Sequence, residues 1–181
     1  MKNVEIDGLN FEIFISLKEI KRKITYLANL VKETYKDEWP VCLVVLNGAV
    51  VFAHELLNQL DSSIEFSLIK VHSYHGTEST GKIHLDYFPY DIVKDNKILL
   101  IEDIVDTGFT LNFLKKELKK HGAKHVECIT LLFKKKEYNY KELPEYIGFQ
   151  IGQEFVVGYG MDLNQKGRDL KNIYKSVIYQ N

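Results

Sequence analysis

The residues best suited to chemistry gather in one run of the sequence, LLIEDIVDTGFT, at positions 99–110. A hydrophobic segment ends in two adjacent carboxylates, Glu102 and Asp103, and a short loop then carries a third, Asp106. Two adjacent acids at the carboxyl end of a strand can accept hydrogen bonds from the two hydroxyls of a ribose. Asp106 would then lie close to the sugar, where it could accept or hold a proton.

The same run continues into a loop at the mouth of a helix, which holds Thr107, Gly108, Phe109 and Thr110. Such a loop offers a phosphate its backbone N–H groups, its hydroxyls and the positive end of the helix dipole. The acids and the loop together therefore predict a site for a ribose 5-phosphate.

Three other interpretations fit parts of these motifs. The triplet DTG (106–108) also occurs in aspartic proteases, which need two such aspartates, but the chain holds one copy and a helical sequence follows it. GTESTGK (76–82) matches a P-loop, but Ile83 replaces the Ser or Thr that binds magnesium, and a strand-like segment follows instead of a helix. Acids at a strand end can also simply cap the next turn; the attached loop favours a ligand site.

Length and composition are those of one globular domain, with 181 residues of which 45% are hydrophobic and 27% charged. A net charge of −1 gives no general reason to expect a nucleic acid or a membrane as partner. Cys42 and Cys128 lie in apolar runs, which predicts buried thiols. The N-terminal segment lacks a continuous apolar stretch, and no run approaches membrane-spanning length, so we expect a cytoplasmic protein.

Two groups of basic residues have simple interpretations. One helix carries a cluster that indicates a solvated face, formed by Lys115, Lys116, Lys119 and Lys120. His72, His75 and His84 lie close in sequence, but no thiol or carboxylate is spaced to complete a zinc site with them.

Alternating strand and helix patterns position the candidate residues. Ser16 and Glu19 form a capping box, and apolar residues at helical spacing follow to about Tyr35. Buried strands are expected over 41–46, 64–71, 97–102 and 125–133, an antiparallel return over 83–88, and helices over 49–60 and 109–121, the last capped by Gly122. This alternation predicts an α/β fold with a mostly parallel central sheet flanked by helices, and ligands at the carboxyl ends of its strands.

The run at 99–110 resembles the phosphoribosyl pyrophosphate signature of the type I phosphoribosyltransferases. Further motifs extend the resemblance over nearly the whole chain and point to the branch that salvages the 6-oxopurines hypoxanthine and guanine. The resemblance implies one domain over 1–181, with a small hood from 1–15 and 137–181 and a mobile hairpin lid at about 72–86.

The resemblance implies functions for two loops. VLNGAVVFAHEL resembles the pyrophosphate loop, which commonly carries a cis peptide, and places Asn47 and Gly48 on the pyrophosphate; many relatives have lysine in place of Asn47. KVHSYHGTESTGK resembles the lid, with Ser73 and Tyr74 as its characteristic pair.

The purine site is implied by two later segments. The first of these segments is LLFKKK, in which the resemblance implies that Lys134 donates to the 6-oxo group of the purine. Lys135 and Lys136 are expected to be solvated. In EFVVGYGMDLNQKGRDL, an aromatic ring stacks on the purine at Phe155, and main-chain groups read the base edge at Val156. The same segment brings Asp162 to the base and to a magnesium ion, and Arg168 to the pyrophosphate, whose oxygens suit its planar fork. Phe109 and Gly167 depart from the residues that many relatives carry there.

The implied activity is transfer of the 5-phosphoribosyl group from phosphoribosyl pyrophosphate to N9 of hypoxanthine or guanine, with release of pyrophosphate. Mg²⁺ is the implied cofactor, held by Glu102, Asp103 and Asp162, and Asp106 is the implied general base at N7 of the purine. The implied partners are small molecules, with neither nucleic acid nor membrane, and the chain is expected to form a homodimer or homotetramer. A xanthine-preferring enzyme and a non-catalytic RNA-binding regulator on the same fold stay open as alternatives.

Overall fold

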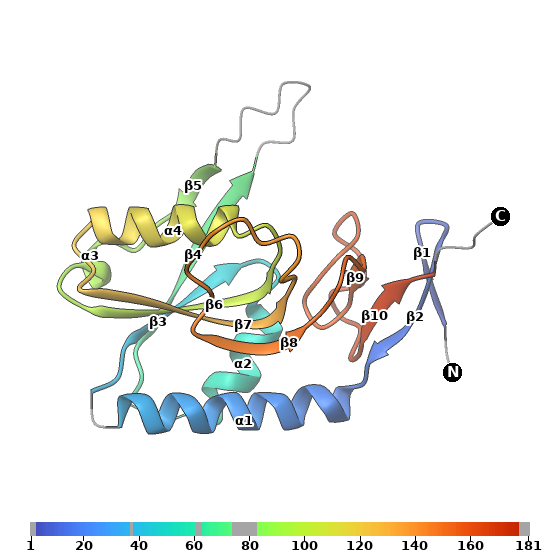
Figure 1. Ribbon diagram of the computed structural model, residues 1–181, viewed down its shortest axis with the longest axis horizontal. Coiled ribbons are helices and arrows are strands. Elements are labelled where there is room, and N and C mark those ends of the chain that lie inside the picture. The colour runs from blue at the N-terminus through green and yellow to red at the C-terminus, as the bar shows by residue number, and fades with distance from the viewer. Residues whose placement is uncertain (1–2, 37, 61–62, 74–82, 178–181) are drawn as a thin grey trace.

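A six-stranded, mostly parallel sheet forms the centre of the molecule (Figure 1). The computed structural model describes residues 3–36, 38–60, 63–73 and 83–177. The strand order is β5-β4-β3-β6-β7-β8, and only β5 runs antiparallel to its neighbour. These strands are β3 (Val41–Leu46), β4 (Phe66–Ser73), β5 (Ile83–Tyr87), β6 (Lys97–Val105), β7 (His125–Phe133) and β8 (Tyr146–Gln150). The predicted α/β fold is confirmed.

The strand order places a topological switch point between β3 and β6. The chain moves outward from β3 to β4 on one side, and from β6 through β7 to β8 on the other. Ligands of open α/β sheets bind at such a point, beyond the carboxyl ends of the two strands. Here those ends lead into the loop at Asn47 and the loop at Asp106.

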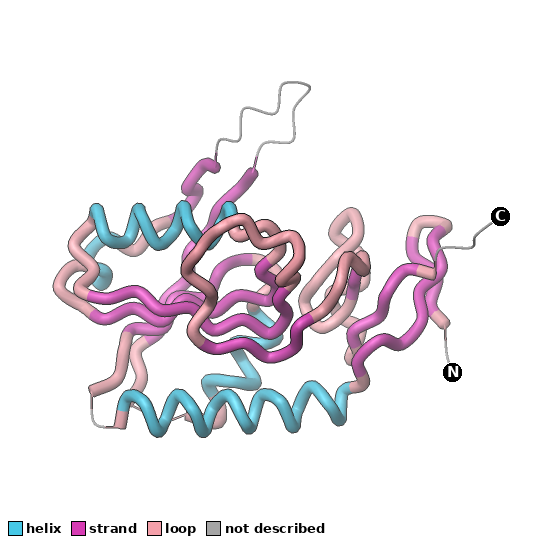
Figure 2. The backbone as a smooth tube through the Cα atoms, viewed as in Figure 1, coloured by secondary structure: helices cyan, strands magenta, loops and turns pink. Residues whose placement is uncertain are grey.

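Helices cover both faces of this sheet (Figure 2). One face packs on α1 (Leu17–Tyr35) and α2 (Val50–Leu57), through a core that includes Ile24, Phe52 and Leu99. The other face packs on α4 (Phe109–Lys120) and the short α3 (Tyr90–Val93). Within the described residues, none of the helices is long and apolar enough to cross a membrane.

A second, antiparallel sheet forms the hood beside the carboxyl ends of the central strands (Figure 1). Its order is β1-β2-β10-β9, with β1 (Val4–Ile6), β2 (Leu9–Ile15), β9 (Val156–Val157) and β10 (Ile173–Ser176). Phe11, Val157 and Tyr174 form its small core. The N-terminal and C-terminal segments therefore meet in one sheet, as the resemblance implied.

Most sequence-based boundaries are confirmed. The capping box at Ser16 and Glu19 is formed, with the Glu19 amide donating to Ser16 Oγ. Both cysteines are buried and free, and burial raises the pKa of the Cys42 thiol to about 12. Residue 83 opens a strand rather than a helix, which removes the P-loop interpretation.

Four expectations about the elements were wrong. Strand β6 does not end at Glu102 but continues to Val105, and α4 ends at Lys120, with His121 rather than Gly122 as its C-cap. β8 lies in the segment assigned to the hood, yet it extends the central sheet. A glycine in the middle of β8, Gly148, weakens the strand pattern; a Cβ there would lie 2.4 Å from the Leu131 carbonyl oxygen.

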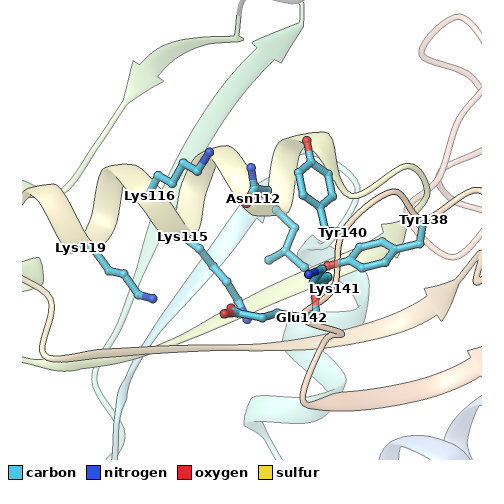
Figure 3. Close-up of a pocket in the computed structure, with 9 residues that line it drawn as sticks. Asn112, Lys115, Lys116, Lys119, Tyr138, Tyr140, Lys141 and Glu142 are labelled. Atoms are coloured by element: carbon cyan, nitrogen blue, oxygen red, sulfur yellow. The ribbon is translucent and has the colours of Figure 1, made fainter.

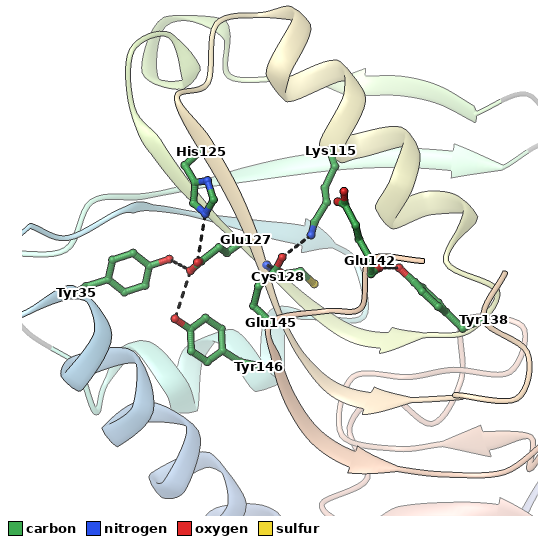
Figure 4. A network of polar contacts seen from close by, with 9 residues as sticks. All are labelled: Tyr35, Lys115, His125, Glu127, Cys128, Tyr138, Glu142, Glu145 and Tyr146. Carbon is green, nitrogen blue, oxygen red and sulfur yellow. Dashed lines mark hydrogen bonds and ion pairs between the residues drawn. The ribbon is translucent and has the colours of Figure 1, made fainter. Parts of the chain in front are cut away.

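The fourth error concerns Lys115, which the sequence placed on a solvated face. Its side chain is 11% exposed, and its Nζ lies 2.7 Å from Glu145 Oε1. Figure 4 shows this pair beside a second polar group, in which Tyr35, Tyr146 and His125 all converge on Glu127. These contacts tie α1, α4, β7 and the start of β8 together.

Candidate active site

The loop after β6 forms a small cavity of about 90 Å³ at the start of α4. Gly108 is the N-cap of α4 with φ +82°, a conformation that favours glycine. A Cβ at this position would also lie 2.3 Å from Cε2 of Tyr138. The cavity is lined by Glu102, Ile104, Val105, Asp106, Thr107, Gly108, Phe109, Thr110 and Leu111. The predicted phosphate-loop residues are thus brought together around a phosphate-sized space.

A second cavity, of about 200 Å³, adjoins the first and shares Ile104 and Asp106 with it. Its lining comes from β6, from the end of β7 and from the segment around β9, and comprises Asp103, Ile104, Asp106, Lys134, Phe155, Val156, Met161 and Asp162. All the residues that the sequence assigned to the purine are among them. The two cavities together offer room for an anionic group and a planar ring on either side of Asp106.

Glu102 and Asp103 are neighbours in β6, and their carboxyl groups interact through a side-chain hydrogen bond. Glu102 lines the phosphate-sized cavity and Asp103 the larger one. Burial raises the pKa of Glu102 well above its ordinary value, and the neighbouring Asp103 charge raises it further. Burial also raises the pKa of Asp103, against which backbone hydrogen bonds and the nearby Arg168 act to lower it.

Asp106 and Lys134 meet across the larger cavity, although they come from different strand ends. Lys134 Nζ lies 2.8 Å from Asp106 Oδ2, and the Lys134 side chain is 12% exposed against 48% for Asp106. The Lys134 amide donates to the Val105 carbonyl at 3.0 Å, which fixes the start of the loop that follows β7. Lys135 and Lys136 are exposed, as expected.

The loop after β3 approaches Asp103 from the neighbouring strand. Its cis peptide bond joins Leu46 to Asn47, and Asn47 is exposed. A Cβ at Gly48 would lie 1.9 Å from Asp103 Oδ2, so any side chain there would displace the Asp103 carboxyl group. On its other side, a Cβ at Gly160 would lie 2.0 Å from the Gly48 carbonyl oxygen. Gly48 is therefore held between the central sheet and the hood.

Arg168 is fixed in the hood by three groups. Its guanidinium donates to the Gly160 carbonyl at 2.7 Å and to Gln165 Oε1 at 3.1 Å, and pairs with Asp162 Oδ1 at 2.7 Å. Asp162 also accepts from the Gln165 amide at 2.7 Å. Because Gly160 lies against Gly48, this network brings Arg168 near the loop after β3.

The carboxylates of the site do not form a metal cage by themselves. Among the described residues there is no group of three or more His, Cys, Asp or Glu side chains that could hold a metal ion. Mg²⁺ commonly binds through one or two carboxylates together with substrate phosphates and water. Glu102 and Asp103, buried and acidic, fit that mode as oxygen ligands, whereas Asp162 is occupied by Arg168.

Phe155 and Val156 lie side by side at the edge of the hood. Phe155 is 45% exposed and its ring centroid lies 6.2 Å from that of Phe11. Val156 is buried and belongs to β9, where it pairs with Lys175 of β10. The hood core therefore supports the aromatic ring that faces the larger cavity.

The hairpin assigned to the lid is described only at its base. β4 and β5 pair antiparallel, with Ser73 opposite Ile83, while Tyr74 and His75 lie outside the described residues. At the base, Asp86 contacts both His72 and His84. This carboxylate was not identified from the sequence.

Sequence reasoning missed several residues of the site, among them Ile104, Met161 and Tyr138. Ile104 separates the two acids from Asp106 and lines both cavities, Met161 lines the larger one, and Tyr138 packs behind Gly108. The strand alternation that continues past Glu102 could have identified Ile104. Met161 and Tyr138 come from irregular segments without periodicity, so their positions follow from the tertiary structure.

The fold and the paired cavities define a class of protein. The chain matches the phosphoribosyl transferase domain family over residues 14–164, and it belongs to that family.

Two relatives with known names are similar to this chain over nearly its whole length. The chain is 38% identical to the hypoxanthine-guanine phosphoribosyltransferase of Lactococcus lactis, with 99% of each chain covered. It is 31% identical to the hypoxanthine-guanine phosphoribosyltransferase of Bacillus subtilis, over 93% of this chain and 96% of the relative.

Solved structures agree with these relatives. A hypoxanthine-guanine phosphoribosyltransferase from Bacillus anthracis superposes with a TM-score of 0.84 at 34% identity, covering 92% of this chain and 98% of the other. A hypoxanthine phosphoribosyltransferase from Staphylococcus aureus superposes with a TM-score of 0.86 at 30% identity, covering 94% of each chain.

Proposed function

We propose that the protein transfers the 5-phosphoribosyl group of phosphoribosyl pyrophosphate to N9 of hypoxanthine or guanine, giving the nucleotide and pyrophosphate. The observation that carries this proposal is the pair of adjoining cavities that share Ile104 and Asp106. One suits a phosphate at a helix N-terminus, and the other suits a planar base beside a lysine and an exposed aromatic ring. The named relatives support the same reaction.

In this proposal the loop from Asp106 to Thr110 binds the 5-phosphate. Its backbone amides and hydroxyls, with the dipole of α4, offset the phosphate charge. Glu102 and Asp103 orient the ribose hydroxyls, and their negative charge favours the positive charge that builds at C1 in the transition state. Because Glu102 lines the phosphate-sized cavity and Asp103 the larger one, we expect Asp103 to contact the ribose on the side of the larger cavity and Glu102 on the side of the phosphate.

The purine enters the larger cavity and replaces the ion pair between Lys134 and Asp106. Lys134 donates a hydrogen bond to the 6-oxo group, and Asp106 interacts with N7 of the purine. Phe155 stacks on the purine ring, and main-chain groups at Val156 form hydrogen bonds with the edge of the base. As the N9–C1 bond forms, the bond from C1 to the pyrophosphate oxygen breaks and its electron pair leaves with pyrophosphate. Asp106 holds the proton that the purine gives up.

The pyrophosphate is bound by the backbone at Asn47 and Gly48 and by Arg168. Glu102 and Asp103 are the side chains that would hold Mg²⁺, with substrate oxygens completing the set, and Asp162 orients Arg168. When bound, the ion neutralises negative charge on the leaving pyrophosphate.

Ser73 and Tyr74 belong to a lid that excludes water during transfer. A cytoplasmic location and assembly as a homodimer or homotetramer belong to the same proposal.

The experiment is nucleotide formation from phosphoribosyl pyrophosphate with hypoxanthine, guanine, xanthine and adenine in parallel, with and without Mg²⁺. We expect product with hypoxanthine or guanine, dependent on Mg²⁺, and none with adenine, which lacks the 6-oxo group for Lys134. Lys134→Gln should lose product while Lys135→Gln, one residue away and exposed, should keep it.

The outcomes separate the remaining alternatives. Product predominantly with xanthine would assign a xanthine-preferring enzyme on the same site. Saturable binding of phosphoribosyl pyrophosphate without product from any base would contradict the proposed activity. A gel-shift assay with RNA, titrated with salt, would then test the regulator.

A further inference from the structure

A third cavity lies along the flank of α4, outside the two that form the candidate active site. Its volume is about 310 Å³, within the range of small-molecule sites. It lies between α4 and the segment 138–142 and is lined by Leu111, Asn112, Lys115, Lys116, Lys119, Tyr138, Tyr140, Lys141 and Glu142 (Figure 3). Leu111 is the one residue it shares with the phosphate-sized cavity.

The spacing along α4 gathers polar residues on this flank. Asn112, Lys115, Lys116 and Lys119 follow the positions i, i+3, i+4 and i+7 of a helix, which lie on one face. The opposite side of the same helix is apolar and packs on the sheet through Leu114 and Leu118. Cations in the last turn of a helix stabilise it by offsetting its dipole. This accounts for a lysine at position 119, in the last turn, but not for a lysine at position 116.

One of the lysines is already neutralised. Lys115 is paired with Glu145 at 2.7 Å, and Glu145 also accepts from the Cys128 amide at 2.7 Å (Figure 4). This pair links α4 to the segment just before β8, and of its two residues only Lys115 lines the cavity. The pair contributes no net charge to a ligand.

The other three lysines of the lining carry excess positive charge. Within the part of the chain that the structure describes, Lys116, Lys119 and Lys141 have neither an ion pair nor a hydrogen bond from their amino groups. Nearby Lys120 pairs with Glu117 instead, at 3.3 Å. Glu142 is the one acid in the lining, so two positive charges are left uncompensated.

We infer that this cavity is a second binding site, for a small ligand that carries two or more phosphate groups. Lysine binds phosphate as a flexible point charge, and three unpaired lysines line this one cavity. The Asn112 amide adds a neutral donor. The rings of Tyr138 and Tyr140, whose centroids are 5.8 Å apart, form an aromatic wall on the other side.

The aromatic wall also connects this site to the phosphate loop. A Cβ at Gly108 would lie 2.3 Å from Tyr138 Cε2 and 2.9 Å from Tyr140 Cδ2, and the Asn139 amide donates to the Thr107 carbonyl at 3.1 Å. A ligand in the third cavity therefore contacts the same segment that supports the loop at 107–110.

The test is a titration of the full-length, ¹⁵N-labelled protein with inorganic tripolyphosphate in magnesium-free buffer, read from backbone amide shifts. We expect saturable shifts at Asn112, Lys116, Lys119 and Lys141, separate from any at 107–110. The variant K116Q/K119Q should weaken binding at these amides by about 10-fold or more, since each lost ammonium removes a charge-assisted contact. It should leave binding at 107–110 unchanged.

The matched control is K32Q/K36Q, which removes two exposed lysines from α1 and its C-cap on the other face of the sheet. This variant should bind like the unmodified protein. Shifts confined to 107–110 and the loop at Gly48, or shifts at the cavity that persist in K116Q/K119Q, would overturn the inference. Cytidine triphosphate in the same titration separates two sources of the phosphates. If cytidine triphosphate binds more tightly than tripolyphosphate, the ligand of the cavity is a nucleotide. If it binds more weakly, the ligand is an inorganic polyphosphate.

Discussion

Asp106 occupies a position that serves two neighbouring spaces. It lines both active-site cavities and is half exposed, and Lys134 holds it in place at 2.8 Å. A carboxylate in this position can reach a proton on a base without losing its contact with the phosphate loop. This geometry favours a role in proton transfer over one in binding.

Replacing Asp106 with asparagine should therefore slow turnover more than it weakens binding. The amide keeps the shape and one hydrogen-bond acceptor but cannot take a proton, so kcat should fall by about 100-fold or more. KM for phosphoribosyl pyrophosphate should stay within a few-fold. Steady-state kinetics measures both values, and Asp91→Asn, an exposed change in α3, is the control. An unaltered kcat would remove Asp106 from the mechanism.

Glu102 shows that the site is arranged for a ligand rather than for stability. Its raised pKa means that folding makes ionisation of this acid less favourable than in the unfolded chain, so stability falls as pH rises above the ordinary value of 4.5 toward the folded-state pKa. Glu102→Gln removes this ionisation. The variant should match the unmodified protein near pH 4.5 and exceed it in free energy of unfolding at pH 8.

Urea denaturation at several pH values measures this difference. Glu33→Gln, on the exposed side of α1, should show no such pH-dependent gain. A difference between Glu102→Gln and the unmodified protein that does not grow with pH would contradict the assigned shift.

At the scale of elements, the site depends on close backbone contact between two loops. The loop after β3 and the turn before Arg168 meet at Gly48 and Gly160, where neither position leaves room for a side chain. The hydrogen bond from Arg168 to the Gly160 carbonyl links this contact to the guanidinium. Two glycines thus set the distance between the hood and the central sheet.

Gly160→Ala should accordingly disturb the site as well as the fold. Its φ is +101°, and its added Cβ would overlap the Gly48 carbonyl oxygen at 2.0 Å. Gly8→Ala is the matched control, because Gly8 also has a positive φ, +78°, but nothing lies within 4 Å of its added Cβ. The control should lose about 1–2 kcal/mol of stability from backbone strain alone.

Thermal denaturation should place Gly160→Ala below Gly8→Ala, and KM for phosphoribosyl pyrophosphate should rise in Gly160→Ala only. Equal effects of the two variants on stability and on KM would mean that the contact at Gly48 is unimportant.

At the scale of the whole molecule, the larger cavity lies between the central sheet and the hood, which has a small core cluster of its own. The central sheet supplies Asp103, Asp106 and Lys134, while the hood supplies Phe155 and Val156. Base binding therefore depends on the hood core, which rests on very few buried residues.

Phe11→Leu tests this division between the two sheets. Phe11 is fully buried in the hood and packs near Phe155, so we expect a several-fold rise in KM for the purine and little change in KM for phosphoribosyl pyrophosphate. Phe52→Leu, equally buried in the core under the central sheet, should lower stability by about 0.5–3 kcal/mol without that selective effect. Equal purine KM values in both variants would contradict a separate role for the hood.

The sequence by itself determined the local structures and their chemistry. Uninterrupted apolar runs specify the buried strands, the capping box at Ser16 starts α1, and the loop at 106–110 carries its own phosphate-binding features. These signals act between near neighbours along the chain, so one sequence suffices to identify them. Strand β8 was not predicted from the sequence, because Gly148 interrupts its pattern of strand-forming residues.

Only the tertiary structure decided which of these parts meet. It placed Lys134 against Asp106, Gly160 against Gly48, and the mostly buried Lys115 in an ion pair with Glu145. It also placed Glu102 in the lining of the phosphate-sized cavity and Asp103 in that of the larger one. Such contacts depend on strand order and on the packing of the hood, which join residues distant in sequence, and local patterns carry no information about either.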